Sequence, residues 1–215
     1  MRKEARILVA NLFLIELVAY LVGSFSISVL ISRMAYGTDI RECGSGNAGT
    51  ANVLRTFGWK PALAVFVVDV GKGGFCAFVV PMLQVTDLDF PLGTLEFAVG
   101  AAAVLGHCYP LFAGFRGGKG VATAAGVLLV TYPFVLALCS VVFLVVIIAS
   151  RVVSVAAVVA SLSAPAGLLV FRQWLDYEVS LPSLYIATGL SIFVVCTHRP
   201  NLVKLWNGSE KKVLG

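Results

Sequence analysis

Long apolar stretches, separated by short polar segments, make up most of the chain. They cover residues 7–34, 61–83, 95–113, 121–150, 155–171 and 183–197. These stretches show no amphipathic period, and most of them approach the roughly 20 apolar residues that cross a bilayer core as a helix. Lipid offers no hydrogen-bond partners to a polypeptide backbone, so we expect membrane-spanning helices.

The fourth stretch, residues 121–150, is too long for one span at about 1.5 Å per residue. Thr131, Tyr132 and Pro133 interrupt it, and proline removes a helical hydrogen-bond donor. We divide it into two shorter helices. The sequence then predicts an all-α, polytopic bundle of seven transmembrane helices in a single domain, residues 1–215. A bundle of six segments with one long, kinked helix is the alternative.

The first stretch follows Met1, Arg2 and Lys3, as the core of a secretory signal would. It continues to about Met34, which is longer than a signal core, and no small-residue cleavage pattern ends it. We interpret it as a retained first span.

Lysine and arginine are unevenly divided between the two sides that seven alternating spans would create. Eleven of these cations lie on the side formed by residues 33–60, 114–120, 151–154 and 198–215. Four lie on the other side: Arg2, Lys3, Arg6 and Arg172. The positive-inside rule places the first side in the cytoplasm and the N-terminus outside, although the basic N-terminus opposes this orientation. The acidic loop 84–96 fits an external face.

Composition supports a membrane protein and excludes an ordinary soluble domain. Hydrophobic residues make up 59% of the chain and charged residues 13%, against about a quarter charged in soluble domains, and the mean hydropathy is +0.95. The cysteines show neither a CxxC pair nor zinc spacing, so we interpret them as reduced packing thiols. They are Cys43, Cys76, Cys108, Cys139 and Cys196.

The first motif spans residues 41–55 and contains a G-x-G-x-x-G pattern. A dinucleotide-binding reading needs a preceding strand, whereas a membrane helix precedes this motif. Glycines still let backbone N–H groups approach an anion, so a phosphate-binding loop is expected. The glycines are Gly44, Gly46 and Gly49; the added donors are Ser45, Asn47, Asn52 and the cationic Arg55. The alternative is a helix-breaking loop with a polar cap.

The second motif, residues 114–123, resembles a P-loop but fails its pattern. Ala113 and Gly120 stand where that motif requires glycine and a hydroxyl residue, so nucleotide hydrolysis is not indicated. A glycine-rich turn that leads into a helix remains a sound phosphate cradle, with Lys119 as a compact charge among Gly117, Gly118 and Gly120. The alternative is a loop whose cations only set membrane orientation.

Further polar residues carry weaker signals. His198, in the motif 197–201 just past the last span, could act as an acid, a base or a hydrogen-bond donor, or could simply be interfacial. We expect a structural or capping role for His107. Asp69 and Lys72 stand three residues apart, and a structural ion pair is expected because charges within a membrane are usually paired.

The absence of a carboxylate cluster limits the kinds of reaction that the sequence indicates. The expected cytoplasmic segments contain only Asp39, Glu42 and Glu210, whereas metal-dependent phosphate chemistry uses clustered carboxylates. No nucleophile elbow is present either. Phosphate would therefore be held by arginine, lysine and backbone amides without a metal or cofactor. All the motifs fall on one expected side, which predicts one active site built from several loops and direct transfer between two bound substrates.

Residues 44–55, 69–73, 106–107 with 115–123, and 198–210 together resemble the bacterial acyl-phosphate-dependent glycerol-3-phosphate acyltransferases, the PlsY family. The resemblance runs from Gly23 to Glu210. It implies a seven-helix membrane bundle that transfers a fatty acyl group from acyl phosphate to the 1-hydroxyl of glycerol 3-phosphate. The products would be lysophosphatidic acid and phosphate, in the first acylation step of bacterial phospholipid synthesis.

The resemblance also assigns roles to particular residues. It implies catalytic roles for Ser45, Arg55, Lys119, Ser154, His198 and Asn201, and a structural role for Glu210. Substrate-binding roles fall on Gly44, Gly46, Asn47, Gly49, Asn52, Gly117, Gly118 and Gly120. The family pattern has Ala-Thr-Asn where this chain has Thr50-Ala51-Asn52, so a threonine donor is displaced by one position.

The expected setting follows from this resemblance. We expect a monomer in the bacterial inner membrane, with a cytoplasmic active site and membrane lipid around it. Functional coupling to a soluble enzyme that forms acyl phosphate is expected, and no nucleic acid partner is. The competing classes are a phosphate transporter, for which the spans offer few polar residues, and another enzyme of phospholipid head groups.

Overall fold

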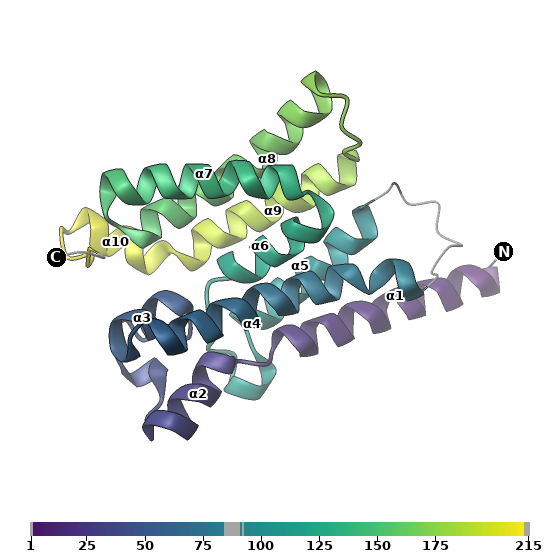
Figure 1. Ribbon diagram of the computed structural model, residues 1–215. Coiled ribbons are helices and arrows are strands. Elements are labelled where there is room, and N and C mark those ends of the chain that lie inside the picture. The colour runs from purple at the N-terminus through teal and green to yellow at the C-terminus, as the bar shows by residue number, and fades with distance from the viewer. Residues whose placement is uncertain (1, 84–90, 92, 213–215) are drawn as a thin grey trace. The chain divides into compact units, whose positions relative to one another are not determined.

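The computed structural model describes residues 2–83, 91 and 93–212, and among residues 2–9 it describes the backbone alone. In these ranges every regular element is a helix, which confirms the all-α prediction. The chain divides into two compact units, Met1–Thr131 and Tyr132–Gly215 (Figure 1). Each unit is described by itself, and the expectation of a single domain stays a prediction.

The first unit contains six α-helices and three short 3-10 turns within its described part. The helices are α1 (Arg2–Gly23), α2 (Ile27–Tyr36), α3 (Thr50–Phe57), α4 (Trp59–Phe78), α5 (Thr94–Cys108) and α6 (Val121–Thr131). The turns are η1 (Ile40–Glu42), η2 (Val80–Leu83) and η3 (Leu111–Ala113). Helix α4 packs against α6 and α5, and α1 packs against α5 (Figure 1).

Glycines allow α4 and α6 to pack with their backbones in close contact. A methyl group on Gly73 of α4 would collide with the carbonyl of Thr123 on α6, and one on Gly126 of α6 would collide with the carbonyl of Val70 on α4. Membrane helices associate through such small residues because lipid provides no hydrophobic driving force between them. The close approach anchors the start of α6, where the second motif ends.

The second unit contains α7 (Pro133–Ser150), α8 (Val153–Trp174), α9 (Leu181–Thr197) and α10 (Arg199–Trp206). Helix α8 packs against both α7 and α9. A cluster of aromatic side chains lies where α7 begins. Phe134 contacts the rings of Phe171 and Tyr177, and Tyr132 lies next to Tyr177. Helices α9 and α10 are bent by 53° at His198.

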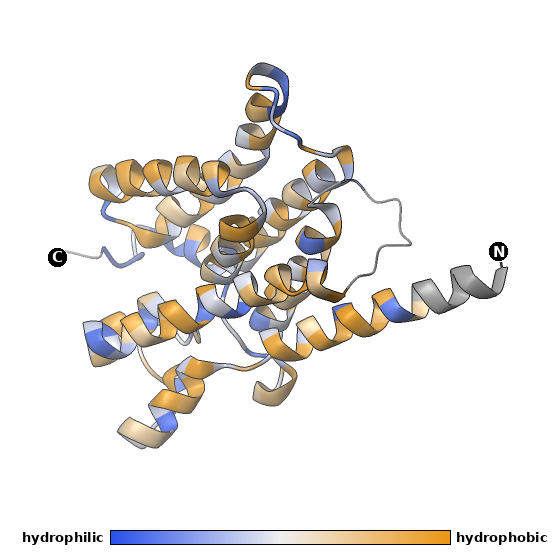
Figure 2. Cartoon of the chain, turned by 45° about the vertical axis from the view of Figure 1, so that its right-hand side comes forward, coloured by the Kyte–Doolittle hydropathy of each residue, from blue (hydrophilic) through white to orange (hydrophobic). Residues whose placement is uncertain are grey.

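Five segments of the described chain are long and apolar enough to cross a membrane, or six when the bent pair α9 and α10 is one span. They are Ala10–Tyr36, Trp59–Leu83, Thr94–Ala113, Pro133–Ser150 and Val153–Trp174. Orange, the colour of hydrophobic residues, predominates along the helices of the cartoon (Figure 2). Helix α6 is apolar but has 11 residues, about 16 Å of helix against a core of about 30 Å. The multi-span prediction is confirmed, whereas the count of seven stays a prediction.

The helix boundaries agree with the sequence prediction at Pro133 and differ from it in the first apolar stretch. The interruption before Pro133 is confirmed, because α6 ends at Thr131 and α7 begins at Pro133. The first apolar stretch, expected as one helix, is divided between Gly23 and Ile27. There the hydroxyl of Ser24 donates to the Tyr20 carbonyl at 2.8 Å, so a side chain caps the end of α1. Most of the acidic loop 84–96 lies outside the described residues.

The packing of α4 on α6 predicts opposite effects for two neighbouring glycines. We expect Gly73→Ala to destabilise the protein by about 1–3 kcal/mol, because the added methyl group meets backbone atoms that cannot move aside. Gly71 lies on the same helix with open space around it, so Gly71→Ala is the matched control and should be neutral or stabilising. Thermal unfolding of the purified protein in detergent measures both. Equal melting temperatures for Gly73→Ala and Gly71→Ala would contradict the close packing of α4 on α6.

Candidate active site

Asn52, on α3, organises the first glycine-rich loop. Its buried side-chain amide donates to the carbonyls of Ile40, Cys43 and Asn47, each at 3.0 Å. Its Oδ1 accepts the backbone N–H of Ser45 at 2.8 Å. An amide NH₂ group has two hydrogens, so three carbonyls occupy it fully. A substrate contact from Asn52, which the sequence predicts, would have to replace one of these bonds.

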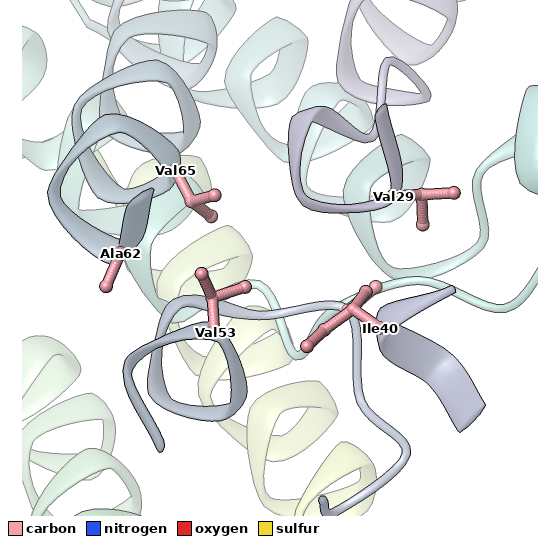
Figure 3. Close-up of a cluster of buried hydrophobic side chains, with 6 residues drawn as sticks. Val29, Ile40, Val53, Ala62 and Val65 are labelled. Carbon is pink, nitrogen blue, oxygen red and sulfur yellow. The ribbon is translucent and has the colours of Figure 1, made fainter. Parts of the chain in front are cut away.

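An apolar cluster beneath the loop fixes α3 and η1 to α2 and α4 (Figure 3). Its buried members are Val29, Ile40, Ala48, Val53, Ala62 and Val65. The hydroxyl of Ser28 on α2 adds a hydrogen bond of 2.9 Å to the Ala48 carbonyl. The loop therefore sits on a packed base, although its own residues are polar or small.

Two of the loop's glycines are required by backbone conformation. Gly44 and Gly46 have backbone φ angles of 57° and 75°, which residues other than glycine rarely adopt. Both are exposed, together with Ser45 between them. The loop thus presents the Ser45 hydroxyl and flanking glycine backbone to the outside of the unit, as an anion-binding loop requires.

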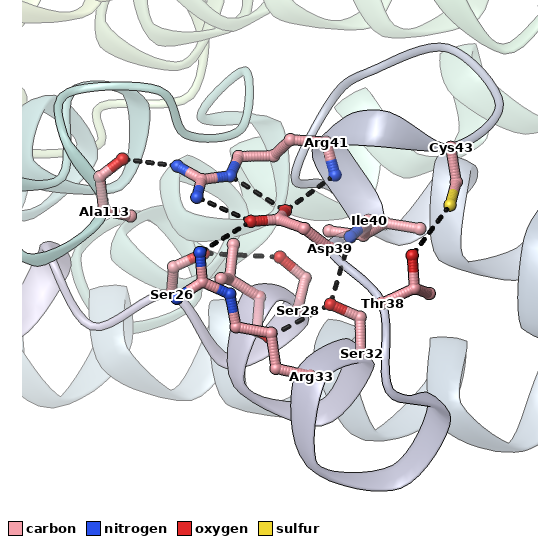
Figure 4. Close-up of polar contacts among 11 residues, drawn as sticks. Ser26, Ser28, Ser32, Arg33, Thr38, Asp39, Ile40, Arg41, Cys43 and Ala113 are labelled. Carbon is pink, nitrogen blue, oxygen red and sulfur yellow. Dashed lines mark hydrogen bonds and ion pairs between the residues drawn. The ribbon is translucent and has the colours of Figure 1, made fainter.

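Asp39 ties the start of the same motif together (Figure 4). Its carboxylate accepts the backbone N–H of Arg41 at 2.9 Å and the Arg41 guanidinium at 2.7 and 2.9 Å, and it accepts Arg33 at 2.8 Å. These hydrogen bonds, chiefly those from Arg41, hold the pKa of Asp39 well below its usual range despite burial. Asp39 is therefore ionised at neutral pH and orients both arginines.

The second glycine-rich loop rests on the end of α5. The backbone N–H of Gly117 donates to the Cys108 carbonyl and that of Gly118 donates to the His107 carbonyl, both at 3.1 Å. A methyl group on Gly118 would collide with Nε2 of the His107 ring, and one on Gly120 would press on Cys108. Gly118 and Gly120 are buried. Their lack of a side chain therefore lets the loop lie directly on the helix.

Hydrogen bonds join the two loops, which are about 70 residues apart in the chain. The Gly117 carbonyl accepts the side-chain N–H of Asn47 at 3.3 Å and the backbone N–H of Ala48 at 3.4 Å. The Arg41 guanidinium also donates to the Ala113 carbonyl (Figure 4). The structure therefore brings the first two motifs together within the first unit, and their joint role in one active site stays a prediction.

The predicted catalytic residues of this unit lie on or beside the joined loops. Ser45 lies in the first loop, Arg55 is exposed on α3, and Lys119 is half-buried in the second loop. The side-chain oxygens of Thr50 and Thr123 are buried and lack a hydrogen-bond partner among the described residues. Such hydroxyls usually bind a water or a ligand. The sequence left the roles of both threonines open.

The expected ion pair of Asp69 and Lys72 is confirmed, with Lys72 Nζ 2.9 Å from Asp69 Oδ1. The sequence did not predict the third member. His107, on α5, places Nδ1 at 2.8 Å from Lys72 Nζ and 3.3 Å from Asp69 Oδ1. All three side chains are buried. The sequence signal for His107 was its place seven residues before the second motif, because α4 and α5 meet only in the folded unit.

In the second unit, Glu210 gathers two predicted catalytic residues. One of its carboxylate oxygens accepts the hydroxyl of Ser154 at 2.9 Å and the side-chain N–H of Asn201 at 2.7 Å. Ser154 lies in the first turn of α8 and Asn201 in α10, so this oxygen links two helices. The geometry agrees with the structural role that the family resemblance implies for Glu210.

His198 lies at the bend between α9 and α10 and is 3% exposed. Its Nδ1 is 2.8 Å from the Val194 carbonyl, which can only accept. Nδ1 therefore carries a hydrogen, and in the neutral ring Nε2 is the acceptor. The backbone carbonyl of His198 accepts the N–H of Asn201 at 2.9 Å, so the first turn of α10 is oriented by the same residue.

The fold and these sites define a class: a multi-span helical membrane protein that carries two joined, glycine-rich loops suited to phosphate. Comparison with known proteins gives the family. Residues 13–208 match the glycerol-3-phosphate acyltransferase family. The glycerol-3-phosphate acyltransferase of Chlorobaculum parvum is 36% identical over 91% of this chain and 94% of its own. That of Listeria monocytogenes is 37% identical over 94% of this chain and 97% of its own.

Two solved structures are also similar to this chain. They are crystal structures of PlsY (YgiH), an integral membrane glycerol 3-phosphate acyltransferase, in a glycerol 3-phosphate form and a lysophosphatidic acid form. Both are 33% identical and cover 94% of this chain and 95% of their own, with TM-scores of 0.82 and 0.80. The chain belongs to the glycerol-3-phosphate acyltransferase family and is a multi-pass integral membrane enzyme of phospholipid synthesis.

The hydrogen bonds of Asn52 predict that its side chain is needed for the shape of the first loop. We expect Asn52→Ala to lower acyltransferase activity at least about tenfold, because it leaves a buried N–H and several carbonyls without their partner. Leu54→Ala, on the exposed side of the same helix, is the control and should keep near-normal activity. Limited proteolysis should cut the loop 43–49 faster in Asn52→Ala alone. Unchanged cleavage and activity would contradict the role.

Proposed function

We propose that the acyl donor of this glycerol-3-phosphate acyltransferase is acyl phosphate, and that the acceptor is the 1-hydroxyl of glycerol 3-phosphate. The observation that carries the proposal is the pair of glycine-rich loops joined at the Gly117 carbonyl. Both substrates carry a phosphate, and the loops present glycine backbone, Ser45 and Lys119 on one unit. The related PlsY structures in glycerol 3-phosphate and lysophosphatidic acid forms support the same acceptor and product.

The reaction needs no protein nucleophile. The 1-hydroxyl oxygen bonds to the acyl carbon, the bond from that carbon to the phosphate oxygen breaks, and the departing phosphate takes the hydroxyl proton. Acyl phosphate is already activated, so catalysis consists mainly of alignment and of charge stabilisation on the phosphates. Lys119 and Arg55 supply the positive charge, and Ser45 with Gly44, Gly46 and Asn47 supplies neutral donors.

The second unit, taken by itself, contains the other residues for which the family resemblance implies a role. Glu210 holds the Ser154 hydroxyl and the Asn201 amide in fixed positions through one oxygen. His198 has a defined tautomer through its bond to the Val194 carbonyl. The family resemblance implies catalytic roles for Ser154, His198 and Asn201, and we propose that Glu210 holds Ser154 and Asn201 in place.

We also propose the membrane arrangement. Seven helical segments cross or enter the bilayer, with the N-terminus outside and the glycine-rich loops in the cytoplasm, in a bacterial inner membrane. The excess of lysine and arginine on the loop side supports this orientation. The protein would act as a monomer that receives acyl phosphate from a soluble enzyme, as the family resemblance implies.

Donor selectivity tests the proposed function. Purified protein is given labelled glycerol 3-phosphate with palmitoyl phosphate, palmitoyl-CoA or palmitoyl acyl-carrier protein, each in buffer containing EDTA. We expect lysophosphatidic acid from the acyl phosphate alone, since in this proposal the loops bind phosphate groups and the reaction requires no metal. Comparable product from a thioester, or activity that returns only when Mg²⁺ is added, would contradict the proposal.

Lys119 provides a second test. We expect Lys119→Ala to raise the KM for glycerol 3-phosphate by about ten- to a hundredfold, the scale of a lost hydrogen bond to a charged group. The protein should remain folded, because the lysine supplies charge to a loop rather than packing to a helix. Lys60→Ala removes an exposed lysine beside Trp59 and is the matched control. A normal KM, or loss of the variant from membranes, would contradict the role.

A further inference from the structure

We propose that Asp69, Lys72 and His107 act together as a positioning platform for the loop 117–120, and through it set the affinity for the phosphate of glycerol 3-phosphate. The inference rests on the proposed function of that loop. It goes beyond a structural ion pair, because it assigns the three buried side chains an effect on substrate binding.

The ammonium group of Lys72 has three hydrogens and finds three acceptors. Nζ lies 2.9 Å from Asp69 Oδ1, 2.8 Å from His107 Nδ1 and 3.3 Å from the Phe25 carbonyl. An ammonium can only donate, so all three partners accept. Lys72 thereby links α4, α5 and the connection between α1 and α2 at one point inside the first unit.

These contacts determine the tautomer of a neutral His107 ring, that is, which of its nitrogens carries the hydrogen. Because Nδ1 accepts from Lys72, the neutral ring carries its hydrogen on Nε2. Nε2 is also the atom nearest to where a side chain on Gly118 would begin. The ring edge that carries this hydrogen therefore lies directly against the second loop, while the opposite nitrogen is held by Lys72.

The backbone of the same residue continues the connection. The His107 carbonyl accepts the Gly118 N–H and the Cys108 carbonyl accepts the Gly117 N–H, both at 3.1 Å. Lys119 is the next residue in the loop. A change in the orientation of His107 would thus move the residue adjacent to the proposed phosphate ligand.

A stability role alone is a weak explanation for this group. Charged side chains within a membrane are costly, and an apolar group of the same size often replaces a buried ion pair without loss of stability. All three side chains are buried, and the ring of His107 meets the loop at Gly118 as well as Lys72 and Asp69 on α4. The arrangement is better explained by the need to hold a glycine-rich loop in one conformation.

The test compares variants of the full-length protein in detergent. His107→Leu removes the acceptor for Lys72, whereas His107→Asn keeps an acceptor near the position of Nδ1. The double variant Asp69→Asn with Lys72→Met removes both charges and leaves neither one unpaired. We expect His107→Leu and the double variant to raise the KM for glycerol 3-phosphate about tenfold with little change for acyl phosphate, and His107→Asn to recover part of the loss.

A second readout does not depend on activity. Amine-reactive labelling of Lys119, measured by mass spectrometry against the exposed Lys60 in the same sample, reports whether the loop has moved. Faster labelling of Lys119 is expected in His107→Leu and in the double variant. Thr131→Val, at the far end of α6, removes a hydrogen bond to the Val127 carbonyl and is the control.

The outcomes separate the two proposals. An unchanged KM for glycerol 3-phosphate and unchanged Lys119 labelling in the triad variants would overturn the platform, even if their melting temperatures fall. Wild-type protein that makes no lysophosphatidic acid from acyl phosphate would overturn the proposed function instead. In that case, faster Lys119 labelling in the triad variants would still support the platform.

Discussion

The carbonyl oxygen of Gly117 is the point on which the proposed phosphate site depends. It receives hydrogen bonds from the side chain of Asn47 and the backbone of Ala48, and so joins two loops about 70 residues apart. Loops of glycine and small polar residues have little apolar surface with which to pack. Their conformational freedom must be restricted by hydrogen bonds, and these bonds hold the first loop against the second.

Each loop is in turn fixed to a helix by a buried polar residue. Asn52 holds the first loop through four hydrogen bonds, and His107 supports the second through its ring and its carbonyl. In the second unit the half-buried Glu210 links Ser154 of α8 to Asn201 of α10 through one carboxylate oxygen. An active site that is rigid before substrate arrives loses less entropy on binding, which suits catalysis by alignment.

Much of this protein could be predicted from its composition and from the length of its apolar stretches. Apolar stretches near the length of a bilayer core predict spanning helices because lipid cannot satisfy a free backbone, and the break at Pro133 follows from its missing N–H. The i,i+3 spacing of Asp69 and Lys72 correctly predicted an ion pair, whereas phosphate binding by the glycine-rich motifs stays a prediction. All of these inferences rest on residues that are near one another in the chain.

The remaining features depend on contacts between distant segments. Only the packing of α4 on α5 brings Lys72 to His107, and only the meeting of the two loops gives Asn47 its partner at Gly117. The burial of Gly118 against His107 likewise shows that a glycine expected to approach substrate also makes room for a helix end. The local spacing of residues cannot predict such pairings, because they arise when helices far apart in sequence pack side by side.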